Sequence, residues 1–167
     1  MLLALSRLDS PVGRLVFAAD DSRLRALEFY QSEAELRTKL ERSLPGARFA
    51  EGAGPSFVVD ALGAYFAGEL NALEGIAAEG AGTPFQRKVW AALRTIPPGR
   101  TTSYRALAGQ IGCPGASRAV GAANGQNPIA LVVPCHRVIA ADGTLCGYGG
   151  GLWRKEWLLR HEGALLA

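Results

Sequence analysis

Short apolar stretches with partial alternation mark the first third of the chain. They cover residues 2–8, 14–18 and 24–29, and their length and spacing are typical of strands whose alternate side chains face one side. Turn-forming residues separate them at Pro11-Val12-Gly13 and Asp20-Asp21-Ser22. The pattern predicts an antiparallel meander of three strands.

The spacing of apolar residues then changes to the helical period. Ser32 is placed to cap a helix over residues 33–44, which Pro45-Gly46 ends. A second helix is predicted over residues 56–70, and its buried face comprises Phe57, Val58, Ala61, Leu62, Tyr65 and Phe66. The first half is therefore predicted to be a small supporting domain of sheet and helices, spanning residues 1–80.

Helices dominate the second predicted domain, residues 81–167. Thr83-Pro84 is a firm helix start, and the helix extends to Ile96. Two short helices follow, over residues 103–111 and about 116–124, joined by Gly112-Cys113-Pro114-Gly115. This spacing, with small residues where the two helices must approach closely, is typical of a helix-turn-helix.

The second helix of this pair has an unusual composition. Residues 117–123 read Ser-Arg-Ala-Val-Gly-Ala-Ala, so Arg118 is the one long side chain that could probe bases. Contact with DNA through this helix would require close approach of the backbone, which favours the minor groove. A small-residue helix buried in a core is an equally good interpretation of these residues alone.

A cluster of polar side chains follows an apolar run near the end of the chain. Residues 129–133 predict a buried strand that carries Pro134-Cys135-His136-Arg137 at its end. A hairpin is predicted around residues 141–143, followed by a glycine-rich segment at 147–151. The final helix is predicted from Leu152 to His161, and Gly163 ends it.

Composition narrows the class of protein. The chain has 167 residues, of which 49% are hydrophobic and 20% charged, values typical of one globular domain or two small ones. No run approaches the roughly twenty apolar residues needed to span a bilayer. The three cysteines are odd in number and lack the spacing of a metal site, which indicates reduced thiols, a cytoplasmic location and no bound metal.

Charge is distributed unevenly between the two halves. Residues 1–80 contain eight Lys and Arg against twelve Asp and Glu, whereas residues 81–167 contain ten against three. The overall charge of +3 is therefore the sum of about −4 and about +7. The second half is predicted to meet a polyanionic partner, with a basic solvated surface as the alternative.

Cys135 is the best candidate for a nucleophile. A cysteine reacts as its thiolate and needs a base, and His136 is adjacent in sequence. Neighbouring residues of a strand point to opposite faces, so proton transfer between them requires a bend, which Pro134 favours, or a bridging water. The carboxylates of this half that could orient the histidine are Asp142, Glu156 and Glu162. Cys113 and Cys146 are interpreted as inert, the ordinary state of a lone cysteine.

Four separated motifs carry a resemblance to a known family. They are Arg118-Ala119-Val120-Gly121, Asn127-Pro128, Pro134-Cys135-His136-Arg137-Val138 and the closing residues 155–163. In this order they resemble the methylated-DNA–protein-cysteine methyltransferases, also called O6-alkylguanine-DNA alkyltransferases, densely from Thr83 to Gly163 and loosely before. The resemblance implies an α+β fold, in which a small ribonuclease H-like N-terminal domain precedes a mainly helical, winged helix-turn-helix DNA-binding domain.

The resemblance also implies a role for each matching residue. Cys135 would accept the alkyl group, His136 would take the thiol proton through a water, Glu162 would orient His136, and Asn127 would hold the turn beside the cysteine. Arg118 matches the arginine finger that replaces a flipped nucleotide, and Tyr104 the tyrosine that hydrogen-bonds the flipped guanine. Further expected DNA contacts are Ser103, Ala119, Gly121, Ala122 and Arg137, and the expected guanine pocket comprises Val138, Tyr148, Gly149 and Trp90.

The activity that the resemblance implies is direct reversal of damage in double-stranded DNA. A methyl or other alkyl group would move from O6 of guanine, and also from O4 of thymine, to Cys135. Each chain would act once, because nothing in the sequence offers a way to cleave the thioether. No cofactor is expected, and no zinc, because residues 1–80 contain neither Cys nor His. A monomer is expected, with cooperative assembly on DNA left open, and Cys146 is a second thiol near the pocket loop that could be oxidised or alkylated.

Three other functions compete with this one. Relatives that lack the cysteine bind alkylated DNA without repairing it, and the presence of Cys135 argues against that role. A Cys-His-Glu hydrolase would turn over repeatedly, which the helix-turn-helix and the basic second half disfavour. A winged-helix regulator would need base-reading side chains, which residues 117–123 lack.

Overall fold

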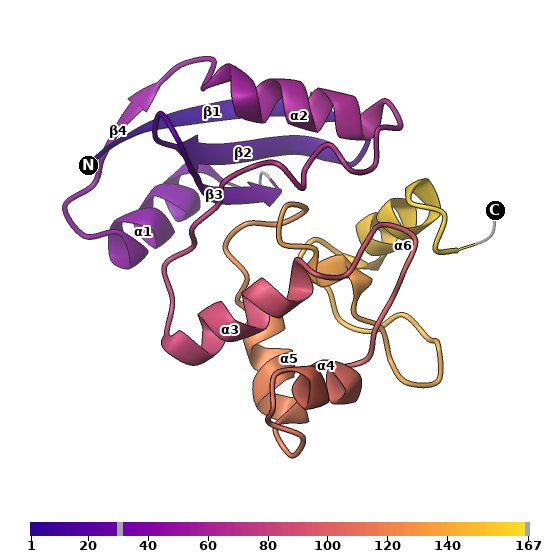
Figure 1. The fold of residues 1–167 in the computed structure, drawn as a ribbon. Coiled ribbons are helices and arrows are strands. Elements are labelled where there is room, and N and C mark those ends of the chain that lie inside the picture. The colour runs from indigo at the N-terminus through magenta and orange to yellow at the C-terminus, as the bar shows by residue number, and fades with distance from the viewer. Residues whose placement is uncertain (30–31, 166–167) are drawn as a thin grey trace. The chain divides into compact units, whose positions relative to one another are not determined.

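The chain folds into two compact units of mixed α and β structure (Figure 1). The computed structural model describes residues 1–29 and 32–165. One unit comprises Met1–Gly82 together with Pro128–Val132, and the other comprises Thr83–Asn127 together with Val133–Ala167. The sequence-based expectation of an α+β protein, with a sheet domain first and a helical domain second, is confirmed.

A four-stranded sheet forms the centre of the first unit. Its strands are β1 (Leu2–Ser10), β2 (Gly13–Ala19), β3 (Leu24–Phe29) and β4 (Arg48–Glu51), in the order β3-β2-β1-β4. The pairs β1–β2 and β2–β3 are antiparallel, as the predicted meander requires, whereas β4 pairs with β1 in parallel. Strand β4 was not predicted, because this short edge strand is mostly exposed and so carries no apolar run.

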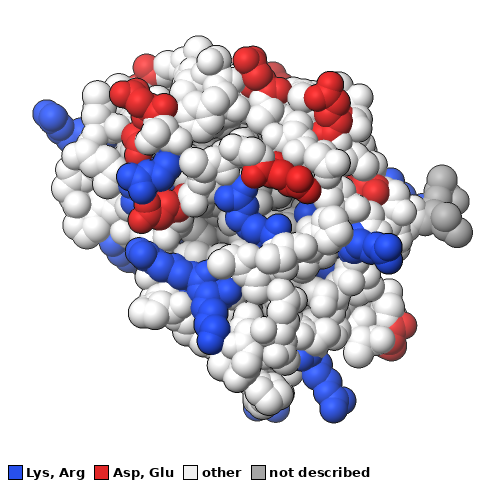
Figure 2. All heavy atoms as spheres, viewed as in Figure 1, with Lys and Arg blue, Asp and Glu red and all other residues white. Residues whose placement is uncertain are grey.

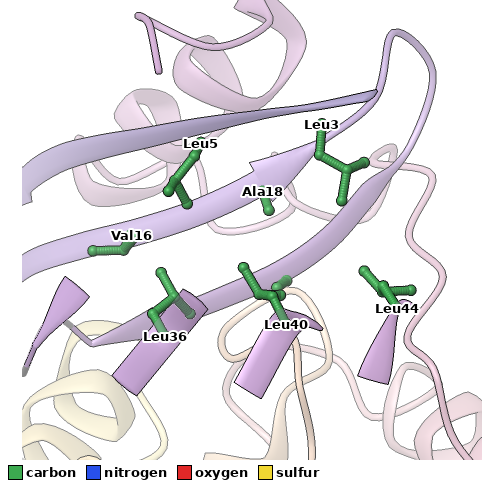
Figure 3. Packing of buried hydrophobic residues seen from close by; sticks show 8 residues of the cluster. Leu3, Leu5, Val16, Ala18, Leu36, Leu40 and Leu44 are labelled. Carbon is green, nitrogen blue, oxygen red and sulfur yellow. The ribbon is translucent and has the colours of Figure 1, made fainter. Parts of the chain in front are cut away.

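Two helices cover the sheet of the first unit (Figure 1). Helix α1 (Glu33–Ser43) begins at Ser32, whose Oγ accepts a hydrogen bond from the backbone N–H of Glu35 at 3.2 Å. Leucines at helical spacing on and just after α1 pack against one face of the sheet; Figure 3 shows the cluster of Leu3, Leu5, Val16, Ala18, Leu36, Leu40 and Leu44. Helix α2 (Ser56–Phe66) buries Val58, Leu62 and Tyr65. It ends four residues before the predicted Leu70, and Gly68 in the turn that follows has a φ of +111°.

Helices build the second unit, as predicted. They are α3 (Pro84–Leu93), α4 (Tyr104–Gln110), α5 (Ser117–Gly125) and α6 (Leu152–His161), with a short 3-10 helix at Cys135–Arg137. A capping box begins α3, because the Thr83 side chain accepts from the Gln86 N–H while the Gln86 side chain accepts from the Thr83 N–H. Helices α4 and α5 pack on each other and both contact α3. No helix within residues 1–29 and 32–165 is long and apolar enough to cross a membrane.

The predicted strand over residues 129–133 is wrong. Ile129 forms an isolated bridge to Leu27, and the chain then turns sharply, with the Val132 N–H donating to the Ala130 carbonyl and Leu131 at a φ of +69°. The predicted hairpin around 141–143 is a turn without flanking strands, closed by the Ala140 N–H and the Thr144 carbonyl. A buried apolar run has the same composition whether it is extended or folded into turns, so periodicity could not separate the two.

Candidate active site

Cys135 lies at the start of the 3-10 helix in the second unit. Its residue exposure is 8%, and its backbone N–H donates to the Val133 carbonyl at 2.8 Å, immediately after Pro134. The chain therefore bends where the sequence analysis expected a bend. Because successive residues of a 3-10 helix are rotated by about a third of a turn, His136 is not forced to the opposite face, as it would be in a strand.

His136, Arg137 and Glu162 form a buried network around one carboxylate. His136 Nε2 lies 2.9 Å from Glu162 Oε2. Arg137 makes a bidentate pair with the same group, from Nε to Oε1 at 2.9 Å and from Nη2 to Oε2 at 2.9 Å. Its Nη1 donates to the Ile96 carbonyl at 2.6 Å. Such a bidentate pair fixes the plane of the carboxylate. The carboxylate in turn fixes the orientation of the His136 imidazole.

The network holds His136 as a neutral base. Burial lowers the pKa of His136, and the neighbouring Glu162 only partly opposes this. Burial works against ionisation of Glu162, but hydrogen bonds from Arg137 and His136 and their charges hold its pKa well below the usual range. A neutral imidazole next to a carboxylate carries its proton on Nε2, so Nδ1 keeps the lone pair. Nδ1 is buried and makes no hydrogen bond within the described part of the chain, which leaves it available to accept a proton.

The environment of the Cys135 thiol favours the protonated form at rest. Burial raises its pKa, while a hydrogen bond from Asn127 and the charge of Lys155 act in the opposite direction. Asn127 Nδ2 also donates to the Val133 carbonyl at 2.7 Å, so this side chain ties the turn before the cysteine to the segment after α5. A thiol held in this way requires a base to become a nucleophile.

Lys155 is a site residue that the sequence analysis missed. Its exposure is 0%, and its Nζ donates to the carbonyls of Val138 at 2.6 Å and Cys146 at 2.7 Å. No carboxylate lies within 4.0 Å of it among the described residues, and lysine is rarely buried without such a partner. A signal was present, because residues 155, 158, 159 and 162 lie on one face of a helix, and Leu158 and Leu159 identify that face as buried.

Asn124 is a second residue that was missed. It is buried on α5, and its Nδ2 lies 3.5 Å from the Cys135 carbonyl. Its side chain also hydrogen-bonds Tyr104. The sequence held no sign of this role, because an asparagine near the end of a helix is ordinary.

Tyr104 and Cys146 meet beside these groups. Tyr104 is the first residue of α4, and Cys146 Sγ lies 3.8 Å from its Oη. Burial, together with the contact from Cys146, raises the pKa of Tyr104 to about 12. The phenol therefore stays protonated and can donate a hydrogen bond at neutral pH. Of the other predicted pocket residues, Val138 is buried, Tyr148 is half-buried and Gly149 is exposed.

Helix α5 exposes a face that consists of small side chains and one arginine, which we call its smooth face. Arg118, Ala119 and Ala122 are exposed on it, and Arg118 forms no hydrogen bond or ion pair with another described residue. Val120 and Ala123 are buried on the opposite face. A Cβ added at Gly121 would lie 3.7 Å from the Tyr104 ring, so the helix passes close to that side chain. The helix is thus neither wholly buried nor lined with long polar groups.

Three predicted contact residues have hydrogen-bond partners within the fold. Trp90 is buried between α3 and α5, and its Nε1 donates to the Ala123 carbonyl at 2.8 Å. Ser103 caps α4 by accepting from the Ala106 N–H at 3.1 Å. The buried position of Arg137, with its guanidinium on Glu162 and Ile96, is at odds with the predicted DNA contact. Within residues 1–29 and 32–165 no group of three or more Cys, His, Asp or Glu side chains could hold a metal ion.

Comparison with known proteins covers both units. Residues 4–78 match the model of the 6-O-methylguanine DNA methyltransferase ribonuclease-like domain, and residues 84–164 that of the 6-O-methylguanine DNA methyltransferase DNA binding domain. A methylated-DNA–protein-cysteine methyltransferase of Salmonella typhimurium is 49% identical over 163 residues, which cover 96% of this chain and 95% of the relative.

Solved structures agree with this match. The crystal structure of Mycobacterium tuberculosis OGT in complex with DNA has a TM-score of 0.81 at 48% identity and covers 96% of this chain and 93% of its own. An O6-methylguanine-DNA methyltransferase from Pyrococcus kodakaraensis has a TM-score of 0.63 at 25% identity, covering 96% and 99%. Since both units match domains of one family and the similarity extends over nearly the whole chain, the chain belongs to the 6-O-methylguanine DNA methyltransferases.

Proposed function

We propose that this chain repairs alkylated DNA by moving an alkyl group from O6 of guanine to Sγ of Cys135. Transfer from DNA to a protein cysteine is the activity of the family to which it belongs. The observation that carries the assignment to Cys135 is the network around it: a buried thiol follows a proline bend and precedes a neutral histidine whose other nitrogen is held by Glu162. Cys113 and Cys146 lack an adjacent histidine.

The reaction begins with removal of the thiol proton. His136 Nδ1 accepts it, through a bridging water, while Glu162 stabilises the imidazolium that forms. The thiolate then attacks the alkyl carbon, so that a carbon–sulfur bond forms as the carbon–oxygen bond to guanine breaks. The electron pair stays on the guanine, and a hydrogen bond from the Tyr104 hydroxyl makes the base a better leaving group. Lys155 favours the charged thiolate through its nearby positive charge.

The target base has to leave the duplex to reach a buried thiol. We assign to Arg118 the filling of the gap that remains, because it is the long, exposed and unpaired side chain on the smooth face of α5. The small residues Ala119 and Ala122 permit close approach of this helix to a minor groove. The backbones of Val138 and Gly149 are assigned to the guanine edge, with Tyr148 beside them, and Asn127 is assigned the hinge before the cysteine.

Charge supports DNA as the partner of the second unit. On the face shown in Figure 2, most acidic side chains lie over the first unit, whereas basic side chains stand over both units and those on the second unit have few acidic neighbours. We propose that residues 81–167 bind DNA and accept the alkyl group, while residues 1–80 support them. Three free cysteines, with no disulfide among them, are compatible with a reducing compartment, and we place the protein in the cytoplasm as a monomer.

The thioether product makes the reaction irreversible. No donor cofactor is required, because DNA itself carries the alkyl group, and we expect one transfer per chain. We extend the substrate to O4 of thymine, whose alkyl group is attached to an exocyclic oxygen in the same manner. A Cys-His-Glu hydrolase is the alternative, and it differs in turning over many times.

One experiment tests the proposal. The protein is incubated with a duplex that contains a single O6-methylguanine, and its intact mass and peptide masses are measured. We expect one added methyl group per chain, on Cys135, with no further turnover in excess DNA. Cys135→Ala should still bind the duplex but gain no mass, and Arg118→Ala should bind with modest loss and transfer much more slowly. Unmodified wild-type protein at saturating DNA would exclude the repair function, and repeated turnover would favour the hydrolase.

A further inference from the structure

Cys146 lies in a part of the second unit that has no regular secondary structure, between Val138 and α6. Nevertheless, both its backbone carbonyl and its thiol have hydrogen-bond partners. Its backbone carbonyl accepts a hydrogen bond from the buried ammonium of Lys155 at 2.7 Å, and its thiol lies 3.8 Å from Tyr104 Oη, within the range of a hydrogen bond that involves sulfur. A second hydrogen bond, to the Val138 carbonyl at 2.6 Å, ties the same ammonium to the residue that follows the 3-10 helix of Cys135–Arg137.

Cys146 Sγ and Tyr104 Oη are each able to donate or accept in this contact. The side chain of Asn124 on α5 is a second hydrogen-bond partner of the same hydroxyl. The phenol oxygen is therefore held by two different segments, which limits the directions in which its O–H can point.

We propose that Cys146 is a positioning residue for Tyr104: with its own carbonyl held by Lys155, its thiol fixes the phenol hydroxyl in the place where it meets the base that loses the alkyl group. This inference rests on the proposed function and concerns the residue that activates the leaving group. Cys146 does not touch the alkyl carbon and does not replace Cys135 as acceptor. Its effect is confined to the step in which the guanine departs, because Tyr104 acts there.

The test is a double-mutant cycle on the rate of methyl transfer. Wild type, Cys146→Ala, Tyr104→Phe and the double variant are mixed with saturating O6-methylguanine duplex, and the methylated fraction is followed in a single turnover. We expect Cys146→Ala to transfer about fivefold more slowly, the size of one modest hydrogen bond, with unchanged affinity for DNA. In the Tyr104→Phe background the same substitution should change the rate by less than about twofold, because no hydroxyl remains to be positioned.

Cys113 provides the matched control. It is also half-buried, but its Sγ lies 3.9 Å from the Ile111 carbonyl in the turn between α4 and α5. Cys113→Ala should transfer at the wild-type rate. An unchanged rate for Cys146→Ala, or the same fivefold loss with and without the Tyr104 hydroxyl, would overturn the positioning role. Both of these results would leave the proposed function intact. That function fails only if Cys135 of the wild-type protein gains no methyl group.

Discussion

The two units treat polar side chains in opposite ways. In the described part of the first unit the one buried polar residue is Ser6, and charged residues pair at the surface, as Arg14 and Asp9 do with side-chain exposures of 53% and 83%. The second unit buries Asn124, His136, Arg137, Lys155 and Glu162. The first unit therefore has an ordinary apolar core, whereas the second unit buries several charged side chains.

This difference identifies where the molecule has been shaped for chemistry. Removing a charge from water is unfavourable, and replacing a buried ion pair by apolar residues often stabilises a protein. A cluster of five buried polar groups is thus a poor way to gain stability. It is a good way to fix the orientation of a base and a thiol, because dipoles and charges that are already in place need no rearrangement during the reaction.

The largest expected effect comes from removing the charge of Glu162. Glu162→Gln leaves Arg137 buried without its counter-charge, and we expect a loss of about 3–5 kcal/mol in the free energy of unfolding. Asp9→Asn makes the same chemical change at an exposed pair in the first unit and should cost less than about 1 kcal/mol. Urea unfolding of both variants measures the difference. Equal losses of unfolding free energy would show that the two units do not differ in how much their ion pairs contribute to stability.

Lys155 tests whether the buried charge serves the reaction. Lys155→Met keeps the length of the side chain but removes the charge that favours the Cys135 thiolate, so we expect transfer at saturating DNA to slow by about tenfold. The exposed Lys88 on α3 is the matched control, and Lys88→Met should leave the rate at saturation unchanged. If both variants transfer at the wild-type rate, the buried ammonium has a structural role alone.

The smallest expected effect concerns pH. Because burial lowers the pKa of His136 below the unfolded value of about 6.5, its contribution to stability is complete above pH 6.5 and is lost as the pH falls toward the folded-state pKa. The slope from one such group is at most about 1.4 kcal/mol per pH unit. Urea unfolding between pH 7.5 and 5.5 should show that the free energy of unfolding depends less steeply on pH in His136→Gln than in wild type. Identical slopes would contradict the prediction that His136 is buried in its neutral form.

Local signals predicted most of the elements. Thr83 and Pro84 begin α3 where a cap followed by proline should, and α6 has the predicted bounds because Gly151 and Gly163 flank a helical apolar pattern. Two of the failed predictions share one reason, which is that the structure of these segments depends on their neighbours in space. Strand β4 exists because β1 offers a free edge, and residues 129–133 turn because their apolar side chains are buried without a ladder.

The candidate site divides in the same way. Cys135 and His136 were found from adjacent residues, and three carboxylates were proposed for the histidine. The fold brings Glu162 to it, while Asp142 holds Thr144 and Glu156 pairs with Arg160. Arg137 was expected to contact DNA, whereas its guanidinium lies on Glu162. A motif shows residue types but not the direction in which a side chain points.

The sequence by itself determined where most helices begin, the three-stranded meander, the resemblance to one family and the choice of Cys135 as the candidate nucleophile, because each rests on local patterns and short motifs. The tertiary structure alone decided which carboxylate meets His136, that Lys155 lies buried on two carbonyls, and that Cys146 touches Tyr104. These contacts join residues 9 to 42 positions apart, and their geometry is set by how α6, the 3-10 helix and α4 pack, which no local pattern encodes.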